Sequence, residues 1–317
     1  QTFEIHDFGT NLSGFIGTSL QVHQPTKLYL VFDEILQDGD VNWRRLGTIA
    51  AVTYELEPGD YNLESFEPYT FRYLKVIVAS GEITLKDLYL REYANPDIKS
   101  ASFSSSDERL DRIFEAGVET FRQNAVDIFM DCPHRERAGW LCDSYFTARV
   151  ANDLSGNTLI ERNFLENYLL PLSFDFLPHG MLPMCYPADH NDSVFIPNWA
   201  MWFVVELEEY LQRSQDQELV DDAKDRVMAL LDYFQAFKNE DGLLESLDSW
   251  IFVEWSAANR FVQDVNYPTN MLFAKTLEAA GKLYGRQDLI REAEAIRFTI
   301  REQSWDGSFF RDHSERL

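Results

Sequence analysis

The segment "DCPHRERAGWLCD", residues 131–143, concentrates ionisable side chains in a short stretch. It holds three carboxylates, Asp131, Glu136 and Asp143, together with a histidine and two arginines. Neighbouring carboxylates disfavour each other's charged form, whereas a nearby arginine favours it. Such a mixture can keep one acid protonated while others stay ionised. Glycoside hydrolysis needs this division, because one carboxylic acid protonates the leaving oxygen and a second carboxylate activates water or attacks directly.

A structural interpretation of the same residues is also open. Asp131 would cap a helix, Pro133 would lie in its first turn, and the arginines would pair with nearby acids. Against this stand Gly139 and Trp140, which interrupt the helix where the interpretation needs it to continue. The segment is therefore expected to be a connector between two helices, with its acids available for chemistry.

Composition narrows the class of protein. The chain has 317 residues, of which 45% are hydrophobic and 14% aromatic, so a sizeable core and roughly two domains are expected. Its formal net charge of −25 disfavours nucleic acid or an anionic membrane as a partner. No apolar run approaches the ~20 residues of a membrane span, and Gln1 is expected to be a processed or engineered end.

Neither a metal nor a cofactor is expected. The three cysteines, Cys132, Cys142 and Cys185, match no zinc spacing and are expected to be mostly buried thiols. The six histidines likewise show no metal-ligand spacing.

Residues 1–96 are predicted to form a β-sandwich domain. Short β-branched and aromatic runs such as "KLYLVFDEI", "AVTYEL" and "RYLKVIVAS" alternate with turn sequences such as "QDGD" and "EPGD". The run "ITLKDLYLREY" is expected to be the closing strand, and "ANPDIKS" the exit from the domain.

Residues 97–317 are predicted to be helical. The stretch "SSSDERLDRIFEAGVETFRQNA" begins with a cap signal and repeats apolar residues with a period close to 3.6. Further helices are expected at 144–154, 157–174, 197–213, 217–238, 268–284 and 288–303.

The segments between these helices contain a sequence repeat. "PHGMLPM", "EDGLLES" and "WDGSFF" each place a turn glycine, Gly180, Gly242 and Gly307, before an extended apolar pair, although chance could produce three such sites. Two helices and a hairpin loop, recurring roughly every 60 residues, are typical of an array of helical hairpins. A ring of six such units needs about 370 residues, so the chain is expected to be cut short at Leu317.

The charged segment resembles a known signature. It is similar to "DCPQRDERLGWTGD" of the α-L-rhamnosidases of glycoside hydrolase family 78, and "FSSSDERLDRIFEAGVETFRQNAVDIFM" before it is similar to what precedes the signature there. In the β region, "DFGTNLSGF", "FDEILQDGD" and "FEPYTFRYLKV" also resemble segments of the family. The resemblance implies a β-sandwich followed by part of an (α/α)6 six-hairpin barrel, and inverting hydrolysis of terminal α-L-rhamnosides.

The resemblance also implies roles for individual residues. Glu136 matches the general acid, and Asp131, Arg135, Trp140 and Asp143 match residues that contact rhamnose. The chain departs from the signature twice, because it is one residue shorter between Arg135 and Glu136 and has "LCD" in place of "TGD". Either Asp131 or Asp143 is therefore expected to play a modified part.

Two more tryptophans fit a sugar site by the same resemblance. Trp199 in "FIPNWAMWF" and Trp250 in "LDSWIFVEW" match family tryptophans, and aromatic rings suit the apolar face of a sugar or the rhamnose methyl group. Packing in the core is the alternative, and it is the prediction for Trp202 and Trp255. Glu254 is expected either to line the site or to form a salt bridge or be exposed to solvent.

The family's general base, a glutamate in the second half of the barrel, resembles no segment here and is expected beyond Leu317. Asp248 and Asp264 are acids near predicted loops and match no catalytic position. The leading prediction is a glycosidase that acts on a carbohydrate containing L-rhamnose, in a periplasmic or extracellular location. The alternatives are a non-catalytic carbohydrate-binding protein and another six-hairpin exo-glycosidase or phosphorylase.

Overall fold

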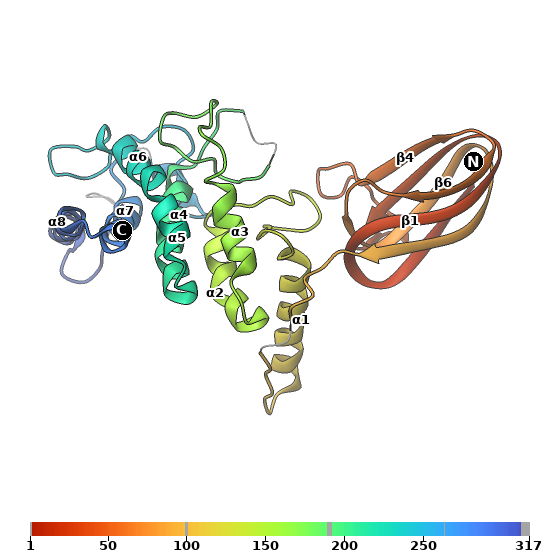
Figure 1. The fold of residues 1–317 in the computed structure, drawn as a ribbon, viewed down its shortest axis with the longest axis horizontal. Coiled ribbons are helices and arrows are strands. Elements are labelled where there is room, and N and C mark those ends of the chain that lie inside the picture. The colour runs from red at the N-terminus through yellow and green to blue at the C-terminus, as the bar shows by residue number, and fades with distance from the viewer. Residues whose placement is uncertain (1, 99–100, 189–191, 263, 312–317) are drawn as a thin grey trace. The chain divides into compact units, whose positions relative to one another are not determined.

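The computed structural model describes residues 2–98, 101–188, 192–262 and 264–311. By internal contacts the chain divides into two compact units. The strand unit comprises residues 1–96, 104–126 and 132–137, and the helical unit comprises residues 97–103, 127–131 and 138–317. Figure 1 colours the strands red to orange and the helices yellow to blue.

Within its described residues, the strand unit is built from two long strands and four short ones, all paired antiparallel. They are β1 Thr2–Asp33, β2 Leu36–Gln37, β3 Asp40–Val41, β4 Ala51–Leu56, β5 Gly59–Glu64 and β6 Tyr69–Glu92. Val78 of β6 is opposite Thr2 in one ladder with β1 and opposite Leu28 in another. Register shifts along this pairing bend both long strands, as bulges do.

One core lies inside this bent sheet. Ile16 and Leu20 from the middle of β1 and Phe32 from its end pack in the same cluster as Phe71 and Leu74 of β6. Buried and less buried residues alternate along these stretches, as expected for strands with one face inward. The sheet therefore folds over itself in two layers, which agrees with the predicted sandwich.

The first helix, α1 Glu108–Asn124, belongs to the strand unit. Asp107 caps it by accepting a hydrogen bond from the backbone N–H of Arg109, as the cap signal predicted. Near its end, Gln123 Oε1 accepts a hydrogen bond of 2.7 Å from the backbone N–H of Ser13. Part of the apolar stripe is exposed, with Ile113 67% accessible.

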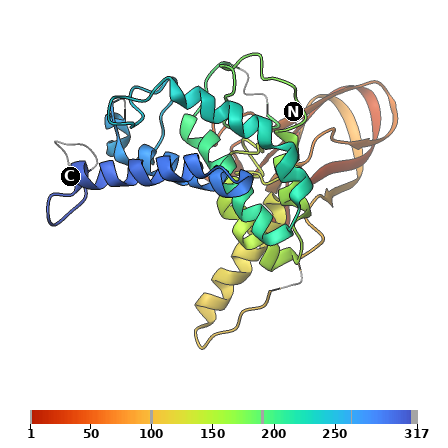
Figure 2. The ribbon, with the colours of Figure 1, turned by 60° about the vertical axis from the view of Figure 1, so that its left-hand side comes forward.

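The helical unit contains seven α-helices and one 3-10 helix in the part that the structure describes. These are α2 Asp143–Ser155, α3 Leu159–Asn167, α4 Pro197–Ser214, α5 Gln217–Asp222, α6 Lys224–Gln235, η1 Ala257–Phe261, α7 Tyr267–Tyr284 and α8 Gln287–Ser304. Helix α4 packs against both α2 and α7, and α7 packs along α8 (Figure 2). The helix predicted at 157–174 ends earlier, and the one predicted at 217–238 is broken at Ala223, which ends α5 and precedes α6.

The three glycines of the repeat all occupy turns that require them. Gly180, Gly242 and Gly307 have φ values of 85°, 75° and 99°, which side-chain-bearing residues rarely adopt. Single β-bridges close two of the loops, between Lys238 and Leu244 and between residues 305 and 310. The hairpin loops predicted around Gly242 and Gly307 are confirmed.

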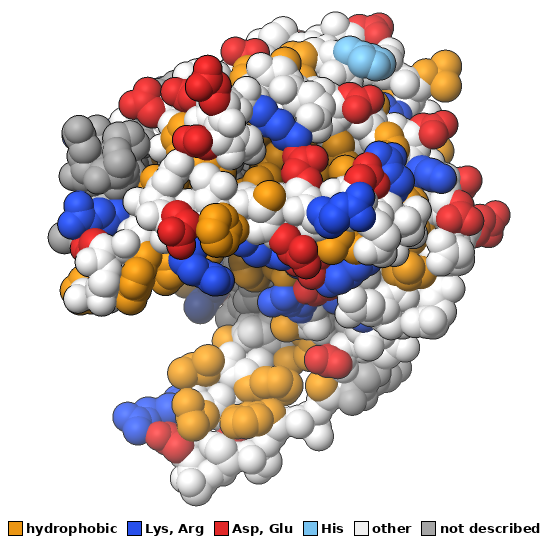
Figure 3. Space-filling view, turned by 90° about the vertical axis from the view of Figure 1, so that its left-hand side faces the viewer, with side chains coloured by type: hydrophobic (Ala, Val, Ile, Leu, Met, Phe, Trp, Pro, Cys, Tyr) orange, Lys and Arg blue, Asp and Glu red, His pale blue; other side chains and the backbone are white. Residues whose placement is uncertain are grey.

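The surface carries both signs of charge. On the face shown in Figure 3, acidic and basic side chains are interspersed, with hydrophobic side chains between them. Met271 of α7 and Phe298 of α8 are among the exposed apolar residues of the helical unit, 59% and 63% accessible. Among the described helices, none is both long and apolar enough to cross a membrane.

Candidate active site

The charged segment is a connector, as predicted, and Gly139 is required within it. Residues 131–142 contain turns and one isolated bridge, and α2 begins at Asp143. A Cβ on Gly139 would lie 2.5 Å from the carbonyl oxygen of Tyr186 and 2.9 Å from the ring of Phe164. The Tyr168 hydroxyl also donates a hydrogen bond of 2.9 Å to the Gly139 carbonyl. No side chain fits at this position without displacing its neighbours, so glycine is required here.

Backbone pairing joins the connector to the loop that follows α3. Trp140 forms an antiparallel bridge with Cys185. On either side of it, the N–H of Leu141 donates to the carbonyl of Met184 and the N–H of Tyr186 donates to the carbonyl of Gly139, both at 3.0 Å. This pairing fixes Trp140 beside the loop that contains "PHGMLPM".

Three predicted site residues, Trp140, Trp199 and Trp250, come together as a tryptophan cluster. They pack around a small buried core of Ala138, Met184, Cys185, Ile196 and Phe252. The Phe252 ring lies edge-on to Trp199 at 4.8 Å and to Trp250 at 5.6 Å between ring centroids. The three tryptophans are only partly buried. Trp199 Nε1 has no hydrogen-bond partner within the described ranges.

The two tryptophans predicted to be core residues differ. Trp202 is half-buried and packs on Tyr145 at 4.6 Å, which agrees with the prediction. Trp255 is 86% exposed, so the prediction was wrong for it. Its ring nevertheless contacts Phe252, with centroids 4.8 Å apart, at the edge of the tryptophan cluster. The local sequence carried no signal for this exposure, because Trp255 lies in a loop, where no helical face determines burial. Glu254 is also exposed.

The two aspartates at the ends of the connector are placed differently. Asp131 is half-buried and closes the connector, because its backbone N–H donates to the Ala138 carbonyl at 3.1 Å. Its Oδ1 accepts a hydrogen bond of 3.2 Å from the Ala138 N–H. Asp143 is exposed and is the first residue of α2.

Glu136 and Arg135 lie in the part of the connector that belongs to the strand unit. Their side chains form an ion pair and are 24% and 51% exposed. The Glu136 N–H approaches Cys132 Sγ at 3.4 Å. Next to them, Arg137 has a φ of 51° and donates to the Pro68 carbonyl at 2.6 Å, which anchors this half of the connector to the strands.

Sequence reasoning missed one ionisable residue beside the connector. Glu206 of α4 is 0% exposed, and its Oε2 accepts a hydrogen bond of 2.6 Å from Ser144 Oγ. Burial, followed by the nearby Glu161 and Glu209 charges, raises the pKa of Glu206 to about 8. Burial also raises the pKa of the Cys142 thiol to about 12. A glutamate inside the apolar run "WAMWFVVELEEYL" was the available signal.

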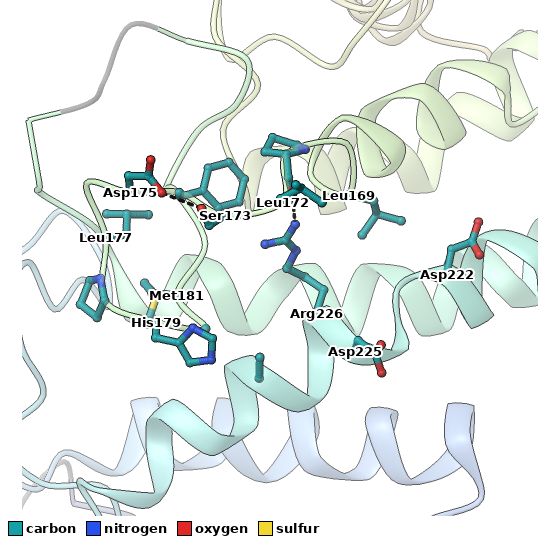
Figure 4. A pocket seen from close by; sticks show the side chains of 15 residues that line it. Leu169, Leu172, Ser173, Asp175, Leu177, His179, Met181, Asp222, Asp225 and Arg226 are labelled. Carbon is teal, nitrogen blue, oxygen red and sulfur yellow. Dashed lines mark hydrogen bonds between the residues drawn. The ribbon is translucent and has the colours of Figure 1, made fainter.

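A separate cavity of about 550 Å³ lies between the loop after α3 and helices α5 and α6 (Figure 4). Arg226 points into it, donates to the Pro171 carbonyl and lies 5.2 Å from the Phe174 ring centroid. None of the predicted site residues lines this cavity. Among the described residues, no group of three or more His, Cys, Asp or Glu could hold a metal ion.

A folded-over sheet, followed by helices whose hairpin loops turn at glycines, agrees with the predicted fold class. Residues 99–299 match the family model for the bacterial alpha-L-rhamnosidase 6 hairpin glycosidase domain. The chain belongs to this family, and the resemblance recognised in the sequence is confirmed.

Individual relatives agree in fold. The structure is similar to a GH78 family rhamnosidase of Bacillus sp. GL1, with a TM-score of 0.83 and 23% identity, over 99% of this chain and 33% of that one. It is also similar to a rhamnosidase from Klebsiella oxytoca with rhamnose bound, with a TM-score of 0.76 and 21% identity, over 100% of this chain and 65% of that one.

A curated relative agrees in sequence. An alpha-L-rhamnosidase of Alteromonas sp. (strain LOR) is 23% identical over 325 residues, which cover 96% of this chain and 34% of the relative. The chain thus spans about a third of the length of that relative.

Proposed function

We propose that the polypeptide carrying this chain is a glycoside hydrolase that removes terminal α-L-rhamnose from glycosides or polysaccharides, with inversion at the anomeric carbon. The observation that carries the proposal is the family match over residues 99–299, which includes the whole connector from Asp131 to Asp143. The partly buried tryptophan cluster supports a carbohydrate ligand, because aromatic rings suit apolar sugar faces.

Glu136 is the proposed general acid. A proton donor in this position would deliver its proton to the leaving oxygen. The Glu136 side chain forms an ion pair with Arg135, which is proposed to contact rhamnose.

The remaining site residues are proposed to bind the sugar. Asp143, which is exposed at the start of α2, would accept hydrogen bonds from sugar hydroxyls. Asp131 would do so in part, since one of its oxygens already accepts from Ala138. Trp140, Trp199 and Trp250 would contact the ring and the methyl group. No residue is assigned as the base, and Asp248 and Asp264 remain without a role.

A carbohydrate-binding protein without catalysis is the second candidate. The backbone hydrogen bond accepted by Asp131 and the connector's missing residue between Arg135 and Glu136 favour it. Saturable binding of L-rhamnose without turnover would support this candidate.

The test is hydrolysis of a panel of aryl glycosides, including the α-L-rhamnoside. It uses the 317-residue chain and the polypeptide encoded by its complete open reading frame. We expect the polypeptide of the complete open reading frame to cleave the rhamnoside. In the same polypeptide, Glu136→Gln is expected to lower kcat by about 10²–10⁴-fold, because proton transfer by a positioned acid contributes that much. Glu67→Gln, which removes an acid that pairs with Arg137 outside the proposed chemistry, is the matched control.

Full activity in Glu136→Gln would refute the assignment of the acid. Turnover that depends on phosphate would indicate a phosphorylase, and cleavage of a different glycoside would indicate another exo-glycosidase.

A further inference from the structure

Glu206 is a buried acid whose surroundings suit its neutral form. It has no exposed surface, and its single described hydrogen bond comes from Ser144 Oγ. Its Oε1 has no partner among the residues that the structure describes. Arg213, the arginine of the same region, donates to Glu161 and Glu209 instead. A buried carboxylate without a cation or several donors is costly, so Glu206 is protonated at neutral pH and acts as a neutral hydrogen-bond partner.

The backbone is strained two residues before Ser144, which Glu206 contacts. Cys142 is the residue before α2, with φ 74° and ψ −56°, and its side chain makes no cap hydrogen bond. A residue other than glycine keeps such a conformation only where its surroundings hold it. The backbone hydrogen bonds Ser144 N–H to Trp140 O at 3.1 Å and Leu141 N–H to Met184 O at 3.0 Å hold one side.

Side chains hold the other side of this turn. Ser144 bonds to Glu206, and Tyr145 Oη donates to Glu209 at 2.9 Å, so that both links run from the first turn of α2 to α4. Of the two, the link from Ser144 is the buried one that directly follows Asp143, with Ser144 0% exposed.

We propose that Glu206 is a positioning residue that holds Ser144 and thereby fixes where the start of α2 presents the carboxylate of Asp143. The inference rests on the proposed function, in which Asp143 binds the sugar. Small displacements of a binding group weaken a site strongly, since orientation is set by the elements behind it. Loss of the link therefore impairs sugar binding more than the proton transfer assigned to Glu136.

The variants separate the hydrogen bond from the charge. Glu206→Leu removes the acceptor, Ser144→Ala removes the donor, and Glu206→Gln keeps a neutral acceptor of similar size. The matched control is Glu208→Gln, because Glu208 is a buried glutamate of the same helix that pairs instead with Lys275 of α7 at 2.6 Å.

The first readout is kinetic and uses 4-nitrophenyl α-L-rhamnoside with the polypeptide of the complete open reading frame. KM is expected to rise about tenfold in Glu206→Leu and Ser144→Ala, roughly the loss of one hydrogen bond, with a smaller change in kcat. Glu206→Gln and Glu208→Gln are expected to keep KM within about twofold.

The second readout needs no activity. Alkylation of Cys142 by iodoacetamide at neutral pH is followed by mass spectrometry, with the buried Cys185 as internal reference. Release of the turn exposes the thiol and lowers its raised pKa, so labelling of Cys142 is expected to accelerate about tenfold in Glu206→Leu and Ser144→Ala. Labelling of Cys185 is expected to stay unchanged in the same samples, and Glu206→Gln is expected to behave like the parent.

Three outcomes overturn parts of this scheme. If Glu206→Leu and Ser144→Ala match Glu208→Gln in both readouts, Glu206 does not position the turn. If Glu206→Gln is impaired like Glu206→Leu, a neutral acceptor is not what the turn needs. Absence of rhamnoside cleavage by the unsubstituted protein defeats the proposed function alone, because alkylation still tests the link. If Glu206→Leu does not fold, Ser144→Ala decides both readouts.

Discussion

The strand unit and the helical unit differ in how deeply their ion pairs are buried. In the strand unit most ion pairs lie at the surface, for example Arg72 with Asp7, whose side chains are 39% and 45% exposed. In the pair of Arg45 with Asp33, the aspartate is instead buried. The helical unit instead buries a network behind the connector.

That network joins three helices. Glu161 of α3 is 1% exposed and accepts from Arg213 of α4, which also contacts Glu209. Glu206 lies on the same helix as Arg213 and bonds to Ser144 of α2. The difference between the units teaches that a buried polar network can join helices, whereas the ion pairs of the strand unit lie mostly at its surface and its interior is an apolar core.

The largest expected effect is on the free energy of unfolding, when one arginine of each unit is replaced. Arg213→Met should lower the free energy of unfolding by about 3–5 kcal/mol, because Glu161 would be left as a buried charge without its cation. Arg72→Met should cost about 1 kcal/mol or less, since its ion pair is exposed. Urea denaturation of the 317-residue chain measures both. Equal losses would show that the buried network does not stabilise the helical unit.

The next effect is a pH dependence set by Glu206. Its pKa is about 8 in the folded chain and 4.5 ordinarily, so between these values the unfolded chain releases a proton that the folded chain keeps. The stability that the neutral form contributes is complete below about pH 4.5 and is lost as the pH rises towards 8. The loss by pH 7 is roughly 3 kcal/mol.

The side chain of Glu206→Gln cannot titrate. The difference in free energy of unfolding between this variant and the parent should therefore grow in favour of the variant as the pH is raised from 5 to 7, by about 2–3 kcal/mol. Parallel curves for variant and parent would contradict the raised pKa. Asp7 has the opposite effect on the pH dependence of stability. Arg72 lowers the pKa of Asp7 to about 2, so the stability that the ionised Asp7 contributes is lost as the pH falls.

The smallest expected effect concerns the strained turn. Cys142→Gly should be more stable than Cys142→Ala by about 1 kcal/mol, because only alanine keeps a Cβ at a φ of 74°. At Val150, an exposed position inside α2, the order should reverse, with glycine about 1 kcal/mol less stable than alanine. Thermal unfolding of the four variants checks the sign. Alanine ahead of glycine at both positions would mean that the turn is not strained.

Local signals made much of the fold predictable. The starts of α4, α7 and α8 fall within one residue of the predicted positions 197, 268 and 288, because proline at the first turn and apolar periodicity act over a few residues. The turn at Gly242 was predictable for the same reason, since its backbone angle favours glycine. The break at Ala223 was not predicted, because the apolar rhythm continues across it.

The sequence by itself determined the sandwich, the helices, the acidic connector and its family signature, since each is written in neighbouring residues. Only the tertiary structure decided that Trp140, Trp199 and Trp250 share one cluster and that Trp255 lies exposed at its edge. Only the packing of α2 against α4 buried Glu206 and placed its carboxyl within hydrogen-bond distance of Ser144. Burial depends on contacts between residues far apart in the chain, and a local pattern does not contain them.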